Sequence, residues 1–133
     1  MVTIFEKIIN REIPTDIIYE TEKSLAFLDI QPVEKGHILL ITKKPYPWMT
    51  DMPESEIAEI FVEAQKIMQK MKQAFGCDYV QLGVNGEEVP HFHIHLIPRS
   101  MDKIENNTLP RKHTPYTNDQ EKNEYITRIK NIL

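Results

Sequence analysis

One stretch of the chain decides how it folds: residues 90–99 read Pro-His-Phe-His-Ile-His-Leu-Ile-Pro-Arg. Three histidines alternate here with apolar residues, and successive side chains of a β-strand point to opposite faces of its sheet. We therefore expect a strand from His91 to Ile97, with His91, His93 and His95 on one face and the apolar residues against the core. Pro90 fits this arrangement, because proline is tolerated at the first residue of a strand.

The sequence around this strand predicts further short strands and one long helix. Strands that flank a single long helix, without regular β-α-β alternation, indicate the α+β class with a mainly antiparallel sheet. We expect a domain over residues 1–100 and a C-terminal extension over 101–133, whose terminal helix packs on the same domain. The expected elements are a short helix at 3–10, a hairpin of strands 17–20 and 24–28, strands at 37–42 and 79–84, a long helix at 53–75 and a last helix from about residue 117.

Capping patterns give the expected ends of the two longer helices. Asp51 with Glu54 resembles a capping box, and Gly76 is suited to end the long helix in a left-handed conformation. Thr117 with Gln120 forms the same kind of box before the last helix.

Composition narrows the classes of function. The 133 residues are 41% hydrophobic, which predicts one globular domain, and a net charge of −4 disfavours broad binding to nucleic acid or to an anionic membrane. The longest apolar runs are too short to span a bilayer, and the first residues carry no export pattern. The single cysteine, Cys77, cannot form an internal disulfide and fits a reducing compartment, so we expect a cytoplasmic protein.

Three kinds of chemistry fit histidines at every second position. One imidazole can attack a phosphate while a neighbour donates a proton, since the ordinary pKa of histidine is about 6.5. Alternatively, three ring nitrogens on one face can bind a metal ion such as zinc. Stacked, hydrogen-bonded rings with a purely structural role are the third reading, and the spacing alone leaves all three open.

The sequence from His91 to Ile97 resembles the signature of the histidine-triad (HIT) superfamily, in which histidines alternate with hydrophobic residues. Other blocks resemble the same family in the same order, and together they cover about residues 3–100: residues 5–9, 12–14, 25–30, 36–41 and 84–85. The resemblance implies a HIT-like fold with a five-stranded sheet. It also implies a nucleotide hydrolase or nucleotidyl transferase that acts at the α-phosphate of a nucleoside 5′-monophosphate conjugate, on a purine nucleotide and without a cofactor.

The resemblance also implies roles for single residues. His93 corresponds to the nucleophile that forms a nucleotidyl-histidine intermediate, and His95 to the residue that hydrogen-bonds the phosphate and the leaving group. His91 supports the nucleophile through its backbone carbonyl, and His37 completes the site from a neighbouring strand. Further positions correspond to the acid on the ribose hydroxyls, Asp29, to the asparagine near the phosphate, Asn85, and to the wall of the base pocket, Phe5, Ile13, Phe27 and Leu28.

This chain departs from the family pattern at three places. Gln31 replaces a residue that is often small and hydroxylated beside the ribose-binding acid. Glu87 and Glu88 stand in a shortened loop where relatives carry a glutamine and a small hydroxyl residue, and a carboxylate repels a phosphate. Thr3 and Glu6 occupy positions where some relatives carry zinc-binding cysteines, so we expect no metal site. The resemblance further implies a homodimer, with the long helix and a central strand at the interface. A nucleotide-binding protein with weak turnover, or a metal-binding protein, remains the alternative function.

Overall fold

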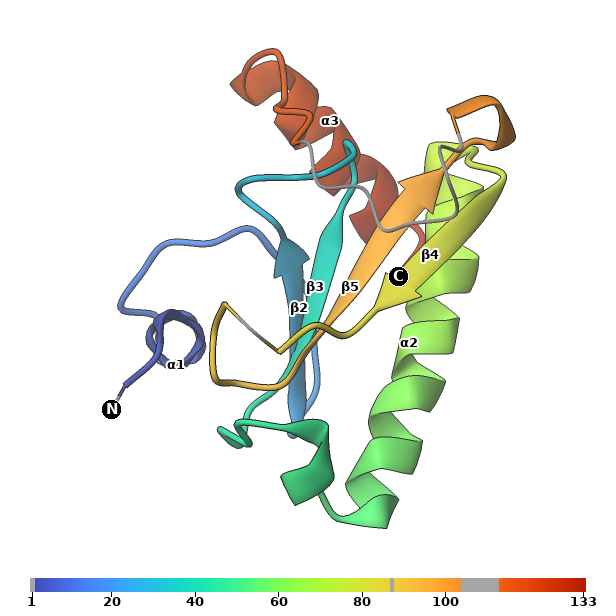
Figure 1. Ribbon diagram of the computed structural model, residues 1–133. Coiled ribbons are helices and arrows are strands. Elements are labelled where there is room, and N and C mark those ends of the chain that lie inside the picture. The colour runs from blue at the N-terminus through green and yellow to red at the C-terminus, as the bar shows by residue number, and fades with distance from the viewer. Residues whose placement is uncertain (1, 87, 104–112) are drawn as a thin grey trace.

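The computed structural model describes residues 2–86, 88–103 and 113–133, and it is built on one antiparallel sheet (Figure 1). The strand order is β1-β2-β3-β5-β4, and every neighbouring pair is antiparallel. This confirms the expected α+β class and the five-stranded sheet. The strands are β1 (Ile17–Glu20), β2 (Ser24–Leu28), β3 (Ile38–Thr42), β4 (Tyr79–Gly83) and β5 (His93–Arg99).

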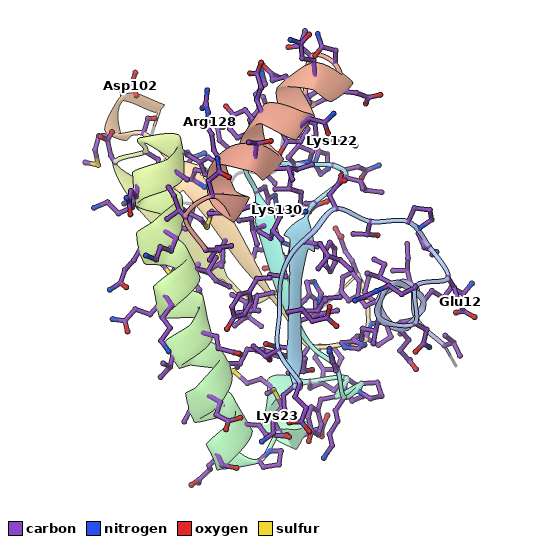
Figure 2. All side chains as sticks on the ribbon, turned by 180° about the vertical axis from the view of Figure 1, so that it is seen from behind. Glu12, Lys23, Asp102, Lys122, Arg128 and Lys130 are labelled. Atoms are coloured by element: carbon purple, nitrogen blue, oxygen red, sulfur yellow. The ribbon has the colours of Figure 1, made fainter. Side chains whose placement is uncertain are left out.

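Three helices lie on the two faces of this sheet: α1 (Ile4–Ile9), α2 (Glu54–Phe75) and α3 (Asp119–Lys130). Seen from behind, α2 and α3 run in front of the strands (Figure 2). The core beneath α2 includes Ile60, Ile67 and Met71 from that helix, and Ile129 of α3 is buried in the same cluster. On the other face, Phe5 and Ile8 of α1 pack in a separate cluster on β2 and β3. No helix in the described ranges is long and apolar enough to cross a membrane.

The helix ends are only partly as the sequence predicts. Gly76 ends α2 with φ of 63°, which confirms the expected left-handed stop. The expected box at Asp51 is wrong, because Pro53 is the N-cap of α2 and Asp51 instead accepts a hydrogen bond from the Trp48 backbone N–H at 3.2 Å. The box before α3 is shifted by one residue, since Asn118 accepts from the Glu121 N–H at 2.9 Å.

The histidine strand begins two residues later than its alternation predicts. β5 starts at His93 because the preceding backbone is drawn into other contacts. The His91 N–H donates to the Val89 carbonyl at 2.8 Å, and the Phe92 N–H donates to the Tyr46 carbonyl at 2.7 Å. His91 thus lies in a turn that leads into the strand, yet its ring stays on the same side as that of His93, because both contact the Phe5 ring.

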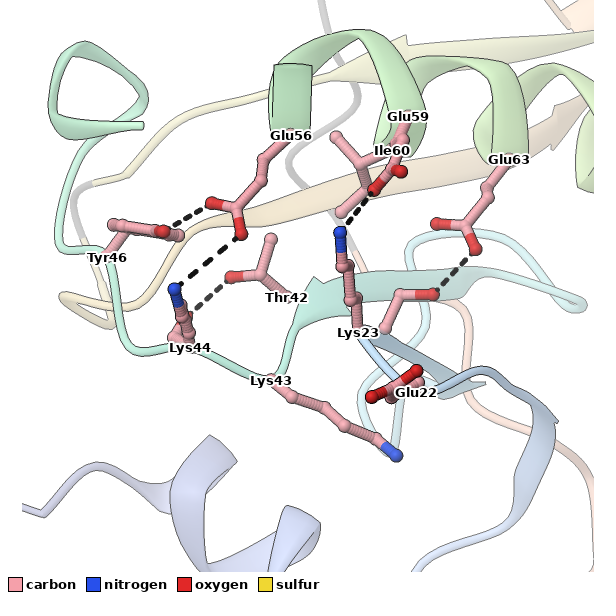
Figure 3. Close-up of a pocket in the computed structure, with 11 residues that line it drawn as sticks. Glu22, Lys23, Thr42, Lys43, Lys44, Tyr46, Glu56, Glu59, Ile60 and Glu63 are labelled. Atoms are coloured by element: carbon pink, nitrogen blue, oxygen red, sulfur yellow. Dashed lines mark hydrogen bonds and ion pairs between the residues drawn. The ribbon is translucent and has the colours of Figure 1, made fainter. Parts of the chain in front are cut away.

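A cleft of about 350 Å³ lies between the β1–β2 turn, the end of β3 and the first turns of α2 (Figure 3). Several of its charged and polar side chains pair with one another. Lys23 lies 3.3 Å from Glu59, and the Ser24 hydroxyl donates to Glu63 at 2.9 Å. The Tyr46 hydroxyl donates to Glu56, which also lies 3.9 Å from the Lys44 ammonium group. We call this hollow the α2 cleft.

Candidate active site

The four histidines predicted to act together lie side by side on the face of the sheet opposite α2. His93 and His95 of β5 pair with Ile41 and Leu39 of β3, which belong to the cluster under α1. The centroids of the His93 and His95 rings are 5.0 Å apart, and those of His37 and His95 are 5.2 Å apart. His37, His91 and His93 are buried, so the fold holds these rings in a site of low dielectric.

One hydrogen bond sets the proton on His93. Its Nδ1 lies 2.7 Å from the backbone carbonyl oxygen of His91, which can only accept. Nδ1 therefore carries the hydrogen, and in the neutral ring Nε2 keeps a free lone pair. The turn at His91 that displaces the start of β5 is what brings this carbonyl to the ring. This arrangement leaves Nε2 of His93 as the ring atom with a free lone pair.

His91 supports this arrangement from a fully buried position. Its Nε2 donates to the Thr42 carbonyl at 2.6 Å, so the ring is anchored to the end of β3. Its Nδ1 finds no hydrogen-bond partner among the described residues. Burial lowers the pKa of His91, which keeps the ring neutral. These contacts fix the His91 ring against β3 and its carbonyl against His93.

A chain of hydrogen bonds sets the protons on His37 and His95. The Val33 backbone N–H donates to His37 Nδ1 at 3.1 Å, so the hydrogen of the neutral ring is on Nε2. That Nε2–H points to His95 Nδ1 at 3.0 Å, which in turn places the hydrogen of His95 on Nε2. Burial and the neighbouring rings lower the pKa of His37 to about 3 and that of His95 to about 4. At neutral pH both are uncharged, and His95 offers an N–H beside the His93 nucleophile.

Asp29 closes the row beyond His37. Its Oδ2 lies 3.6 Å from His37 Nε2, and its Oδ1 accepts the Gln31 N–H at 2.9 Å. Burial raises the pKa of the Asp29 carboxyl, and the charge of Glu88 raises it further, while the Gln31 N–H and His113 act in the opposite direction. Glu88 and His113 therefore lie within electrostatic reach of Asp29.

Asp29, His37 and His95 also form the one group in the described ranges whose ligand atoms lie close enough to hold a metal ion, within 4.8 Å of one another. The hydrogen bonds argue against this use. His37 Nδ1 already accepts from Val33, so its Nε2 bears a hydrogen and has no lone pair for a cation. The donor set does not fit a metal site unless the His37 contact to Val33 is broken.

Three of the four apolar residues expected to line the base pocket lie together on the histidine face of the sheet. Phe5 and Phe27 are buried together with ring centroids 5.8 Å apart, and Ile13 packs against the same cluster. Leu28 is not brought to this face: it is buried in the core beneath α2, because neighbouring residues of β2 point to opposite faces. The inclusion of Leu28 in the base pocket is therefore corrected.

Two further residues lie near Asp29, and the sequence predicted a role in the site for neither of them. Ile30 directly follows Asp29 and is 78% exposed, although it is a large apolar side chain. His113 lies far away in sequence, and its Nδ1 donates to the Gln31 carbonyl at 2.8 Å. The sequence shows that an apolar residue directly follows Asp29. It does not show that His113, more than 80 residues later, lies against Gln31.

Comparison with known proteins agrees with this geometry. The model of the HIT domain matches residues 10–102. The chain belongs to the HIT family. A HIT-like protein of Methanocaldococcus jannaschii is 43% identical over 101 residues, which cover 72% of this chain and 78% of that protein. The adenosine 5′-monophosphoramidase of Saccharomyces cerevisiae is 41% identical over 105 residues, 75% of this chain and 64% of the yeast protein. The crystal structure of a HIT-like protein from Bartonella henselae superposes with a TM-score of 0.83 at 32% identity, covering 98% of this chain and 96% of that one.

The loop before the triad is where this HIT domain differs from the family pattern. Asn85 and Glu88 are both exposed, and Glu87 lies outside the described residues. Asn85 lines a small cavity together with His93. Glu88 also contributes to the raised pKa of Asp29, so its charge acts on the acidic end of the histidine row.

Proposed function

We propose that this HIT protein is a nucleotide hydrolase or nucleotidyl transferase that cleaves a nucleoside 5′-monophosphate conjugate at its α-phosphate. The observation that carries the proposal is the hydrogen bond from His93 Nδ1 to the His91 carbonyl. It leaves Nε2 as a bare lone pair on a ring that is held in place, which is what covalent catalysis on phosphorus needs.

The reaction follows in two balanced steps. In the first step, a bond forms between His93 Nε2 and the α-phosphorus, the bond to the leaving group breaks, and the leaving atom takes a proton from solvent. In the second step a water oxygen bonds to phosphorus, the bond to Nε2 breaks, and the proton of the water returns to solvent. In a transferase another hydroxyl or phosphate takes the place of water. His95 Nε2–H donates a hydrogen bond to the phosphoryl oxygens, where charge builds up in the transition state.

The remaining residues fit the parts of a purine nucleotide. Asp29 is placed to accept hydrogen bonds from the ribose hydroxyls, and Asn85 reaches the phosphate side of His93. Phe5, Ile13 and Phe27 offer an apolar wall for the base. The yeast relative supports a phosphoramidate as substrate, and acyl-adenylates and dinucleoside polyphosphates are the other candidates that the family resemblance suggests.

A second candidate is a nucleotide-binding protein with weak turnover. The Glu88 carboxylate favours this alternative, because it stands in the loop where relatives carry a hydroxyl that can donate a hydrogen bond, and an ionised carboxylate cannot donate. The two candidates differ in whether the covalent intermediate forms.

The test is single-turnover labelling with a phosphoramidate whose α-phosphorus is radioactive. We expect acid-labile label on the protein within the first turnover, and none on His93→Ala at the same protein concentration. Nucleotide binding without label on the wild-type protein would favour the second candidate. A panel of adenosine and guanosine conjugates then identifies the base and the leaving group.

We also propose that the protein is a cytoplasmic homodimer. β4 lies at the edge of the sheet next to α2, and an edge strand presents backbone groups that can pair with a second copy. A two-fold contact through β4 and α2 would place β4 inside a joined sheet. Light scattering at tens of micromolar protein tests this, and a monomeric mass would contradict it.

A further inference from the structure

A second hollow, of about 200 Å³, opens directly beside the nucleophile. It lies at the end of the histidine row opposite to Asp29, because β5 runs from His93 past His95 while His37 and Asp29 follow beyond His95. A nucleotide whose ribose is at Asp29 and whose phosphorus is at His93 would therefore direct its leaving group here. The residues of this hollow that matter below are His93, Trp48, Met49, Val84, Asn85 and Gly86. We call it the Trp48 cavity.

The walls of the Trp48 cavity are apolar and accessible. Trp48 is 52% exposed, Met49 39% and Val84 38%, so three of the large apolar side chains that the structure leaves exposed gather around one catalytic histidine. Single exposed apolar residues need no explanation, whereas a group of them in a concave site indicates a ligand surface. No wall residue other than His93 is ionisable.

The fold keeps Trp48 in this position. Gly86 adopts φ of 73°, and a Cβ atom there would lie 2.8 Å from Trp48 Cζ3. Only glycine therefore allows the loop backbone to pack against the indole ring. On its other side the Trp48 backbone N–H is held by the Asp51 carboxylate at 3.2 Å. The Gly86 contact thus makes the indole one wall of the cavity, and the hydrogen bond to Asp51 holds the backbone that carries it.

Size and charge together limit the occupant. An apolar cavity of roughly 150 Å³ is sufficient to bind benzene, so the Trp48 cavity holds one aromatic ring and its short linker. A second nucleotide with its phosphate bridge is larger, and its charged phosphates would enter an apolar hollow that provides no cation among its wall residues.

We propose that the Trp48 cavity is the leaving-group subsite and that it selects leaving groups with an uncharged aromatic ring, so that the preferred substrates are nucleoside 5′-phosphoramidates of aryl-alkyl amines. This rests on the function proposed above. In the first step the phosphorus–nitrogen bond breaks as the bond to His93 Nε2 forms. The amine nitrogen takes one proton from solvent, and its ring remains against Trp48 until the amine leaves.

The test compares two substrates that differ only in one ring: the adenosine 5′-phosphoramidates of 2-phenylethylamine and of ethylamine. We expect the wild-type protein to prefer the phenylethyl compound by about tenfold in kcat/KM, the size of a typical aromatic contact plus the buried ring area. Trp48→Ala should bring this ratio to within about threefold of one, and Trp48→Phe should keep most of it. Val62→Ala, which removes a comparably exposed apolar residue on α2, should leave the ratio unchanged.

The outcomes separate this proposal from the function on which it rests. Equal efficiency on both compounds in the wild-type protein overturns the subsite and leaves the hydrolase intact. If neither compound is hydrolysed, the reaction is wrong, and binding then decides the subsite. Trp48 is the single tryptophan of the chain, so its emission reports on occupancy of this cavity alone. A dissociation constant about tenfold lower for the phenylethyl compound, with a change in emission, supports the subsite, and equal constants overturn it.

Discussion

The histidine site and the α2 cleft are both lined by polar groups, but the two regions use those groups differently. In the α2 cleft most charged groups pair with neighbouring groups of the protein: Lys23 pairs with Glu59 and Lys44 with Glu56 inside the hollow (Figure 3), and Lys43 pairs with Glu20 just outside it. In the histidine site the rings are held by backbone groups and by one another. Nε2 of His93 and Nε2 of His95 take no partner from the described part of the chain.

This difference shows that the larger of the two cavities need not be the one that binds a ligand. The α2 cleft, at about 350 Å³, is larger than the Trp48 cavity beside His93, at about 200 Å³. Polar groups that already pair with one another have few free hydrogen-bonding atoms for a ligand. A ring that is held in place with one unpartnered nitrogen can bind a ligand without rearranging. The two regions meet at Thr42, whose side chain lines the cleft and whose carbonyl accepts from His91.

The largest effect is expected at His93. His93→Ala should lower turnover by about 10³-fold or more, since it removes the atom that forms the covalent bond, while nucleotide binding should change by less than about tenfold. His95→Ala should slow the reaction less, because it removes one hydrogen bond in the transition state. Steady-state kinetics with calorimetric binding measures both. Lys23→Ala in the α2 cleft is the control, and turnover by His93→Ala equal to that of the wild type would refute the assignment.

The next effect concerns the stability of the fold in mild acid. His37 and His95 have folded pKa values of about 3 and about 4, below the ordinary value of about 6.5. As pH falls below about 6.5, the unfolded chain binds protons that the folded chain does not, so these rings reduce stability down to their folded pKa values. Each contributes at most about 1.4 kcal/mol per pH unit in this window.

His37→Gln tests which ring is responsible. Glutamine has an amide N–H that can still donate to His95, but it does not titrate. We expect the free energy of unfolding in urea to fall less steeply in this variant than in the wild type between about pH 6 and about pH 5, above the range where most carboxylates protonate. Identical slopes in the two proteins would mean that His37 does not stay neutral on folding.

A smaller effect on the reaction rate is expected at Glu88, because this side chain is exposed and solvent screens its charge. Glu88→Ser should raise the rate on a dinucleoside polyphosphate by about fivefold relative to that on a phosphoramidate, because it removes repulsion from an anionic leaving group. The gain should shrink at high salt, since Glu88 is exposed. Glu54→Ser, at the exposed start of α2, is the matched control. Equal changes for both substrates would show that the charge does not act on the leaving group.

The sequence predicted the strands and the histidine row because alternation is a local property. The same rule separates Phe27 from Leu28, and applying it to β2 would have kept Leu28 out of the base pocket. Other features depend on contacts between distant segments, which no local pattern contains. The packing of Trp48 on Gly86 and the approach of His113 to Gln31 are of this kind. The N-cap of α3 is Asn118 and not the neighbouring Thr117. Both residue types can cap a helix, so the sequence alone does not decide between them.

The smallest effect is expected in the α2 cleft itself, at the ion pair between Lys23 and Glu59. Its 3.3 Å distance looks favourable, but the side chains are 61% and 58% exposed, so water and salt screen the attraction. Exposed pairs of this kind contribute roughly 0.2–1 kcal/mol. Lys23→Ala should therefore lower the free energy of unfolding by less than about 1 kcal/mol, and a double-mutant cycle with Glu59→Ala should give a coupling in the same range.

Neither variant should change kcat/KM by more than about twofold, because the pair lies on the α2 side of the sheet, away from the histidines. Urea unfolding and the phosphoramidate assay, run on the same preparations, measure both quantities. A loss of activity without a loss of stability would mean that the cleft is coupled to the site. Thr42, which contacts both regions, would then be the residue through which that coupling should be sought.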